Sequence, residues 1–392
     1  MAPLKQVSII FTSKLFFTFL RLGLTAFGGP AMIAYIRDLA VKKNGWVSEE
    51  SFKHGVAVSQ TIPGATAMQV AAYVGLRSGG PWGAIAAYIG FGLPAFLLMV
   101  TLAALYQSAH ELAAVVSMFK GLQVIVIALV AHATFNFGRS SIKIWQDIAL
   151  GLSVTIFLVL HDNPIIAILV SALLGLLLYQ KMAFKLKDAA TSSTGVSIRD
   201  FKTPILLTAT LLTGMLLLFF VNRQLFDLSV VMTKVDFFAF GGGYGSVPLM
   251  FNEVVSARHW LDSKVFMDGI ALGQVTPGPF VITATFVGYL MAWLPGAFVG
   301  TVSIFAPSLI LLTAVIPCFD RLQGSVLFQR MMHGVLVSFV GLLLSVTIRF
   351  ILAIQWDAYQ IGIVFLALVA LRFKIDILWV VLVGSALSIL LL

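Results

Sequence analysis

Two short stretches combine a glutamine with a proline–glycine pair inside otherwise apolar sequence: "SQTIPGAT" (59–66) and "GQVTPGPF" (273–280). Proline breaks a helix because it lacks a backbone donor, and glycine lets the backbone come close to a ligand. An amide side chain in apolar surroundings needs a hydrogen-bonding partner, either a neighbouring helix or a bound ligand. Because the pattern occurs twice beside a helix break, we favour a ligand for Gln60 and Gln274. Thr276 adds a hydroxyl group.

Two glycine motifs precede these elements, "FGGP" (27–30) and "FGGGYGSVP" (240–248). Each glycine costs about 1 kcal/mol in a helix relative to alanine, so a cluster of them indicates a need for close backbone approach. A broken helix also exposes N–H groups and a partial positive charge, which attract anions. Gly241 and Gly245 equally form a small-xxx-small pair typical of tight helix packing. The occurrence of the motif in both halves favours a substrate site.

Charged residues accompany both glycine motifs. Arg21 and Lys234 stand six residues before the phenylalanine of each motif, where a cation could neutralise an anionic substrate. The alternative is a helix-end charge that reaches toward the membrane interface. Asp38 and Glu253 lie just beyond the motifs and are candidate proton carriers in a coupled cycle, with solvated loop acids as the alternative.

The chain is a tandem duplication. Residues 46–64 and 260–278 align without gaps at a spacing of 214 positions, and a spacing of 213 pairs the two glycine motifs. We place the first transmembrane repeat at 12–180 and the second at 225–392. Between them, 181–224 holds a basic cytoplasmic connector and one linking helix.

The composition predicts an all-α polytopic membrane protein. Of 392 residues, 60% are hydrophobic and 10% charged, too few charges to cover a water-facing surface. About 13 apolar segments approach membrane-spanning length, and some of them are short, broken or re-entrant. With six segments a repeat and one linking helix, equivalent positions are an odd number of spans apart. The repeats therefore have inverted topology, an arrangement in which transporters bind substrate near the midplane.

The basic residues favour a membrane role over a nucleic-acid role. The net charge of +9 comes from residues in loops, and those of the connector place it in the cytoplasm by the positive-inside rule. The loop that carries Arg37, Lys42 and Lys43 departs from this rule. One cysteine, Cys318, excludes an internal disulfide and a cysteine-built metal site. The chain shows no P-loop, HExxH motif or hydrolase triad, so we expect no enzyme activity, cofactor or metal.

The stretches "LGLTAFGGP", "WVSEESFKHGVAVSQTIPG", "FFAFGGGYGSVPLM" and "GQVTPGP" closely resemble the chromate transporter family, and the likeness covers almost the whole chain. The resemblance implies a multi-pass carrier of the bacterial inner membrane with two oppositely oriented halves, which exports chromate using the proton motive force. Sulfate, also a tetrahedral dianion, is implied as a competitor. The motif positions carried over are Phe27, Gly28, Gly29, Pro30, Gln60, Pro63, Gly64, Phe240, Gly241, Gly242, Gly243, Gln274, Pro277, Gly278 and Pro279.

The predicted function is secondary active transport of chromate and similar oxyanions. A tetrahedral dianion accepts hydrogen bonds and donates none, so its site needs converging N–H groups and one or two cations. The alternatives are a passive anion channel and a sulfate uptake carrier on the same scaffold, because broken helices suit all three. The expected partners are the oxyanion, a proton as coupling ion, the lipid bilayer and a second copy in a homodimer, with no nucleic acid.

Overall fold

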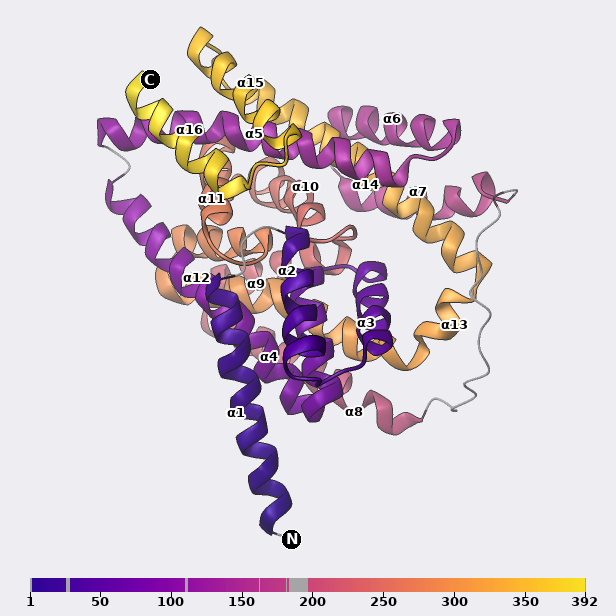
Figure 1. Cartoon of the computed structure of the whole chain (residues 1–392). Coiled ribbons are helices and arrows are strands. Elements are labelled where there is room, and N and C mark those ends of the chain that lie inside the picture. The colour runs from indigo at the N-terminus through magenta and orange to yellow at the C-terminus, as the bar shows by residue number, and fades with distance from the viewer. Residues whose placement is uncertain are drawn as a thin grey trace. The chain divides into compact units, whose positions relative to one another are not determined.

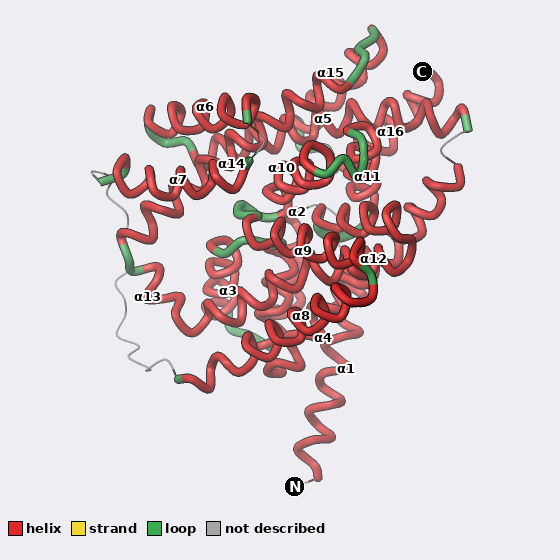
Figure 2. The backbone as a smooth tube through the Cα atoms, turned by 180° about the vertical axis from the view of Figure 1, so that it is seen from behind, coloured by secondary structure: helices red, strands yellow, loops and turns green. Residues whose placement is uncertain are grey.

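The computed structural model describes residues 2–25, 29–109, 112–161, 163–180, 182 and 197–391, and every regular element within them is a helix (Figures 1 and 2). The chain forms two compact units, and each takes segments from both repeats. Unit 1 comprises Met1–Glu111, Thr203–Phe237 and Leu272–Leu312. Unit 2 comprises Leu112–Lys202, Phe238–Ala271 and Thr313–Leu392.

The main helices of unit 1 are α1 (Ala2–Thr25), α2 (Gly29–Arg37), α3 (Glu49–Thr61), α4 (Thr66–Ala109), α8 (Lys202–Val221), α9 (Arg223–Phe238) and α12 (Thr283–Val315). Helix α8 occupies the segment expected to hold the linking helix. Its 20 residues extend about 30 Å, the thickness of the hydrocarbon core. Phe220 and Val221 near its end are exposed, as expected of side chains that face lipid.

Helix α4 is a helical hairpin. Its 44 residues would extend about 66 Å if straight, roughly twice the hydrocarbon thickness. The helical conformation breaks at Gly79 and Gly80, and Gly80 has a φ of 64°. The two halves then fold back on each other so closely that a Cβ at Gly75 would collide with the backbone carbonyl of Gly83.

Helix α12 repeats this hairpin 213 positions further along the chain. Its break falls at Ala292 and Trp293, and a Cβ at Gly288 would collide with the backbone carbonyl of Gly296. The breaks and the glycine contacts therefore recur at equivalent positions. The predicted two-fold repeat is confirmed in the backbone as well as in the sequence.

The main helices of unit 2 are α5 (Ala113–Ser141), α6 (Trp145–Leu160), α7 (Pro164–Leu178), α10 (Ser246–Phe251), α14 (Val326–Ala353), α15 (Ala358–Arg372) and α16 (Ile377–Leu391). The long helix of each repeat packs on the terminal pair of the other. Helix α5 contacts α15 and α16, whereas α14 contacts α6 and α7 (Figure 1). The paired helices have 15 or 16 residues, about 22–24 Å, and are shorter than the hydrocarbon core.

The all-helical membrane fold is confirmed, while the number of spans stays a prediction. Within the described residues, five helical stretches are long and apolar enough to cross a membrane: Thr66–Ala109, Ala113–Ser141, Lys202–Val221, Phe280–Gln323 and Val326–Ala353. The first and fourth of these contain the hairpins α4 and α12, so each provides two helices rather than one.

We expect Gly288→Ala to destabilise the protein by about 1–3 kcal/mol, because the added methyl group forces the hairpin of α12 apart. The matched control is Gly214→Ala in α8, where a Cβ meets no atom within 4 Å. Thermal unfolding in detergent measures both. Equal stability of the two variants would contradict the close hairpin packing.

Candidate functional site

Both Pro–Gly elements interrupt helices, and both interruptions lie in unit 1. The first falls between the end of α3 at Thr61 and the start of α4 at Thr66. The second falls between the end of α11 (Ser263–Val275) and the 3-10 turn Phe280–Ile282 that leads into α12. Gly64 and Gly278 have φ values of 112° and 128°, a region that favours glycine. The backbone therefore requires the glycine of each pair.

Each loop packs against the long hairpin of the other repeat. A Cβ at Gly64 would collide with the Ser308 hydroxyl of α12, and a Cβ at Gly278 would lie 2.9 Å from Ala95 Cβ of α4. Ala95 and Ser308 are equivalent positions, and each directly follows a proline within its helix. The arrangement is thus crossed and two-fold, with each helix break covered by the proline-containing part of the other repeat's hairpin.

The two hairpins also touch each other beside the loops. The Tyr88 hydroxyl of α4 donates to the Phe305 carbonyl of α12 at 2.7 Å. The two rings meet edge to face, with centroids 6.2 Å apart. We call residues 62–66 and 276–283, together with Ala95 and Ser308, the crossed-loop site.

Two buried amides belong to this region. Gln274 is 7% exposed, and its Oε1 has no hydrogen-bond partner among the described residues. Gln69 is fully buried and donates from Nε2 to the Pro63 carbonyl at 2.6 Å, which fixes the first loop. Gln60, by contrast, is exposed. Sequence reasoning missed Gln69, although an amide five residues after Gly64 in an apolar stretch was the available signal.

The hydrogen-bond donors of the site come mainly from the backbone. The first N–H groups of a helix have no hydrogen-bond partner within that helix. At the start of α4, the Gln69 N–H donates to the Ala65 carbonyl. The hydroxyls of Thr276 and Thr283 donate to the Gly273 and Phe280 carbonyls, both at 2.9 Å. The start of α4 therefore offers backbone donors to a ligand, whereas the unpartnered Gln274 Oε1 is an acceptor and the donors of this amide are on its Nε2. This chemistry suits an anion.

The predicted cations both lie in unit 1. Arg21 is exposed on α1, and Lys234 is half-buried on α9. Their roles in anion binding stay predictions.

The two glycine motifs belong to different units. Phe27 and Gly28 of the first lie outside the described residues, and α2 begins at Gly29, followed by Pro30. The motif 27–30 falls within unit 1, whereas 240–248 falls within unit 2. A site shared by both motifs therefore stays a prediction.

The second glycine motif is a tight turn with φ values of 83° at Gly241 and 81° at Gly242. A Cβ at Gly241 would lie 2.7 Å from the Phe137 ring, and Phe240 meets Phe339 edge to face. Gly243 begins a 3-10 turn that leads into α10. Backbone conformation and close packing thus account for the first two glycines, independently of any ligand.

The two predicted proton carriers stand in equivalent π-helices, Asp38–Lys43 and Asn252–Ala257. The π-helix is rare and often marks a functional site. Each acid is paired with a cation: Lys42 Nζ lies 2.8 Å from Asp38, and Arg258 binds Glu253. The hydrogen bond from Lys42 holds the pKa of Asp38 below its usual value. Proton transport by either acid stays a prediction.

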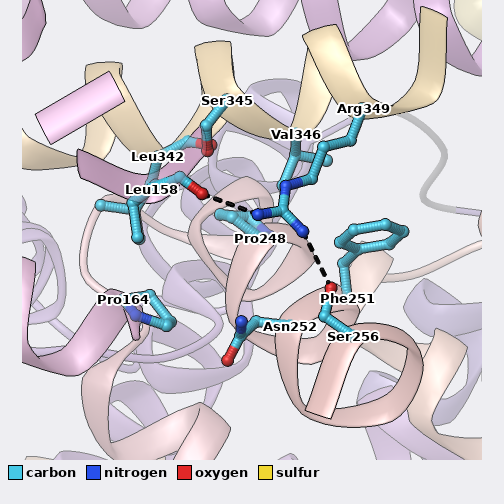
Figure 3. Close-up of a pocket in the computed structure, with 10 residues that line it drawn as sticks. All are labelled: Leu158, Pro164, Pro248, Phe251, Asn252, Ser256, Leu342, Ser345, Val346 and Arg349. Atoms are coloured by element: carbon cyan, nitrogen blue, oxygen red, sulfur yellow. Dashed lines mark hydrogen bonds between the residues drawn. The ribbon is translucent and has the colours of Figure 1, made fainter. Parts of the chain in front are cut away.

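Arg349 of α14 lines a separate pocket in unit 2 (Figure 3). Its guanidinium donates to the Leu158 carbonyl at 2.7 Å and to the Ser256 hydroxyl at 3.1 Å. Leu158 lies in the last turn of α6, where a cation complements the helix dipole. This contact ties α6 and the second π-helix to α14. Sequence reasoning did not single out Arg349.

The chain matches the family described as chromate transporter twice, over residues 13–176 and 226–389. It is 44% identical to an uncharacterized transporter of Methanocaldococcus jannaschii, over 97% of this chain and 94% of that protein. It is 32% identical to a chromate transport protein of Pseudomonas aeruginosa (86% and 80% covered) and 28% identical to one of Cupriavidus metallidurans (82% and 78%). No solved structure matches the chain.

We expect Gly64→Ala to destabilise the protein more than Gly45→Ala does. Gly45, with a φ of 60°, lies in the left-handed helical region, where a side chain costs about 1–2 kcal/mol, whereas Gly64, with a φ of 112°, lies outside that region and is less favourable for a side chain. Only the Gly64 substitution also collides with Ser308, since a Cβ at Gly45 meets no atom within 4 Å. Thermal unfolding of both variants measures the extra cost of packing and backbone conformation at Gly64, and equal losses would contradict the crossed packing.

Proposed function

Because the chain belongs to the chromate transporter family, we propose that it is a secondary active transporter that exports chromate and similar tetrahedral dianions using the proton motive force. It is a multi-pass integral membrane protein. The relatives named as chromate transport proteins support chromate as the substrate. Sulfate has the same shape and charge and is the expected competitor.

The observation that carries this proposal is the crossed-loop site. Two helix breaks, each requiring glycine at positive φ, are buried against proline-containing helices of the opposite repeat. In hydrocarbon, irregular backbone persists only where protein covers it or where it lines a cavity. The N–H groups at the start of α4 and the Gln274 amide supply donors to a ligand that only accepts. The site contains no carboxylate of its own among residues 62–66 and 276–283.

The membrane potential is a sufficient driving force for export of a dianion. Moving one charge through 100 mV is worth about 2.3 kcal/mol, so two negative charges gain about 4.6 kcal/mol in leaving an inside-negative cell. A coupled proton changes the net charge that moves and hence this gain. Export against a chromate gradient then needs no nucleotide hydrolysis.

A passive anion channel and a sulfate uptake carrier are the competing functions. A channel gives flux that does not saturate and follows only the anion's electrochemical gradient. An uptake carrier concentrates sulfate inside right-side-out vesicles. The carrier proposed here gives saturating flux directed out of the cell.

The decisive experiment measures labelled chromate uptake into inverted membrane vesicles, with and without an imposed proton motive force and with excess sulfate. We expect saturable uptake that depends on the proton motive force and is reduced by sulfate. Saturable uptake whose rate and extent do not change with energisation, or flux that does not saturate, would overturn the coupled mechanism. Absence of chromate flux would overturn the substrate.

Gln274→Leu should raise the KM for chromate at least about tenfold, because a hydrogen bond to a charged group contributes roughly 1.5–3 kcal/mol. The control is Gln224→Leu in α9, an exposed amide that donates to the Met291 carbonyl at 3.1 Å. Its KM should remain that of the parent protein. An unchanged KM for Gln274→Leu in initial-rate measurements would remove this amide from the substrate site.

A further inference from the structure

A row of polar side chains joins α9 to α12 within unit 1. Ser229, Thr233 and Asp236 follow one another at helical spacing on one face of α9. Ser303 of α12 donates to the Ser229 hydroxyl at 2.9 Å, and its carbonyl lies 3.4 Å from the Thr233 hydroxyl. This carbonyl is free because Pro307, four residues later, has no N–H to offer it. The polar row thus contacts α12 where Pro307 interrupts the hydrogen bonds of that helix.

Asp236 ends this row and is fully buried. The Ser308 N–H donates to its carboxylate at 2.7 Å, and the Ser308 hydroxyl lies 2.8 and 2.6 Å from the two carboxylate oxygens. Ser308 is also the residue on which Gly64 packs. One side chain therefore separates a buried carboxylate from the first loop of the crossed-loop site.

The equivalent interface in the first repeat is apolar. Phe16, Leu20 and Gly23 of α1 stand where Ser229, Thr233 and Asp236 stand in α9. Likewise, Gly90 and Ala95 of α4 take the places of Ser303 and Ser308.

The apolar interface packs closely without any carboxylate. A Cβ at Gly23 would collide with the Phe91 carbonyl, and one at Gly90 with the Phe16 carbonyl. The same helix–helix interface is thus packed with glycines in the first repeat and contains a buried acid in the second repeat. Since burial of a carboxylate is costly, its presence in only one repeat points to a role other than packing.

We propose that Asp236 is the proton-binding residue of the transport cycle, and that its protonation allows a dianion to bind at the crossed-loop site. The ionised carboxylate engages both donors of Ser308 and repels a dianion through a medium of low dielectric constant. A proton bound to the carboxylate removes the repulsion and releases the Ser308 hydroxyl. This inference rests on the proposed function, because it assigns the coupling step of that same site.

Given the groups that face Asp236, one proton is sufficient to neutralise its carboxylate. Its recorded hydrogen bonds come from the neutral donors of Ser308, so protonation breaks no ion pair. The titratable side chain recorded near it from another helix is Tyr88 of α4, whose hydroxyl is already donated to Phe305. Lys234 lies two residues away on α9 itself. Asp38 and Glu253, in contrast, are each held by a cation.

The charge balance remains compatible with export. One proton and one dianion move together with a net charge of −1, and the proton leaves the carboxylate on the side where the dianion is released. The inside-negative potential drives this pair outward with half the gain of the bare dianion, and a pH gradient that is acidic outside opposes the exit of the proton by about 1.4 kcal/mol per pH unit.

The test compares the parent protein with Asp236→Asn, Asp236→Glu and the control Asp227→Asn in proteoliposomes. Asp227 lies on the same helix but is half-exposed and paired with Arg223. The measured quantity is the half-saturating chromate concentration in counterflow without a gradient, between about pH 7 and pH 9, where buried carboxylates titrate. Chromate is mainly the dianion in this range, so the pH acts on the protein.

We expect the half-saturating concentration for the parent and Asp227→Asn to rise toward about tenfold per pH unit as the linked proton is lost. Asp236→Asn should change less than about twofold over the range, and Asp236→Glu should retain the dependence. If Asp236→Asn transports chromate with the pH dependence of the parent, the inference is overturned while the transport function stands. If the parent shows no saturable counterflow, the function fails, and the inference fails with it.

Discussion

Backbone polar groups inside a membrane have no water to bond with, and this constraint governs the structure described here. Each repeat interrupts a helix at a Pro–Gly pair, so each interruption has to be covered by protein. The cover comes from the other repeat: the loop at Gly64 lies on α12, and the loop at Gly278 lies on α4. The glycine-packed hairpins of α4 and α12 place the proline-containing halves that provide these surfaces. The backbone donors that remain at the breaks then become available to an anion.

The two repeats share a backbone design but differ in chemistry. Their breaks, hairpins and π-helices recur at spacings of 213 or 214 positions. The α1–α4 interface is packed with glycines, whereas its counterpart in α9 and α12 carries Asp236 and its hydroxyl neighbours. Gln274 is buried, while Gln60 is exposed. A two-fold scaffold thus holds a one-sided set of buried polar groups, because Asp236 and Gln274 both belong to the second repeat.

Periodicity and special residues predicted much of this from the sequence. The repeated Pro–Gly pairs located both helix breaks, because few other residues tolerate that backbone, and the aligned glycines identified the duplication. The charge pattern along the chain also indicated a loop at Arg77 and another at 291–294, next to the two hairpin bends, although Ala292 and Trp293 carry no turn signal of their own. The sequence did not identify the roles of Asp236, Gln69 and Arg349. The role of a single polar side chain in an apolar segment depends on the helix that it contacts. Tertiary contacts, rather than local pattern, decide such roles.

Binding of a tetrahedral dianion at the crossed loops is the step on which the proposed transport depends. The most direct measurement locates tungstate, a tetrahedral dianion with a heavy central atom, in an experimental density map of the purified protein. We expect the heavy atom beside the start of α4, with oxygens within about 3 Å of backbone N–H groups and of the Gln274 amide. Density found at the Arg349 pocket or at Gly241–Gly243, with none at the crossed loops, would contradict it.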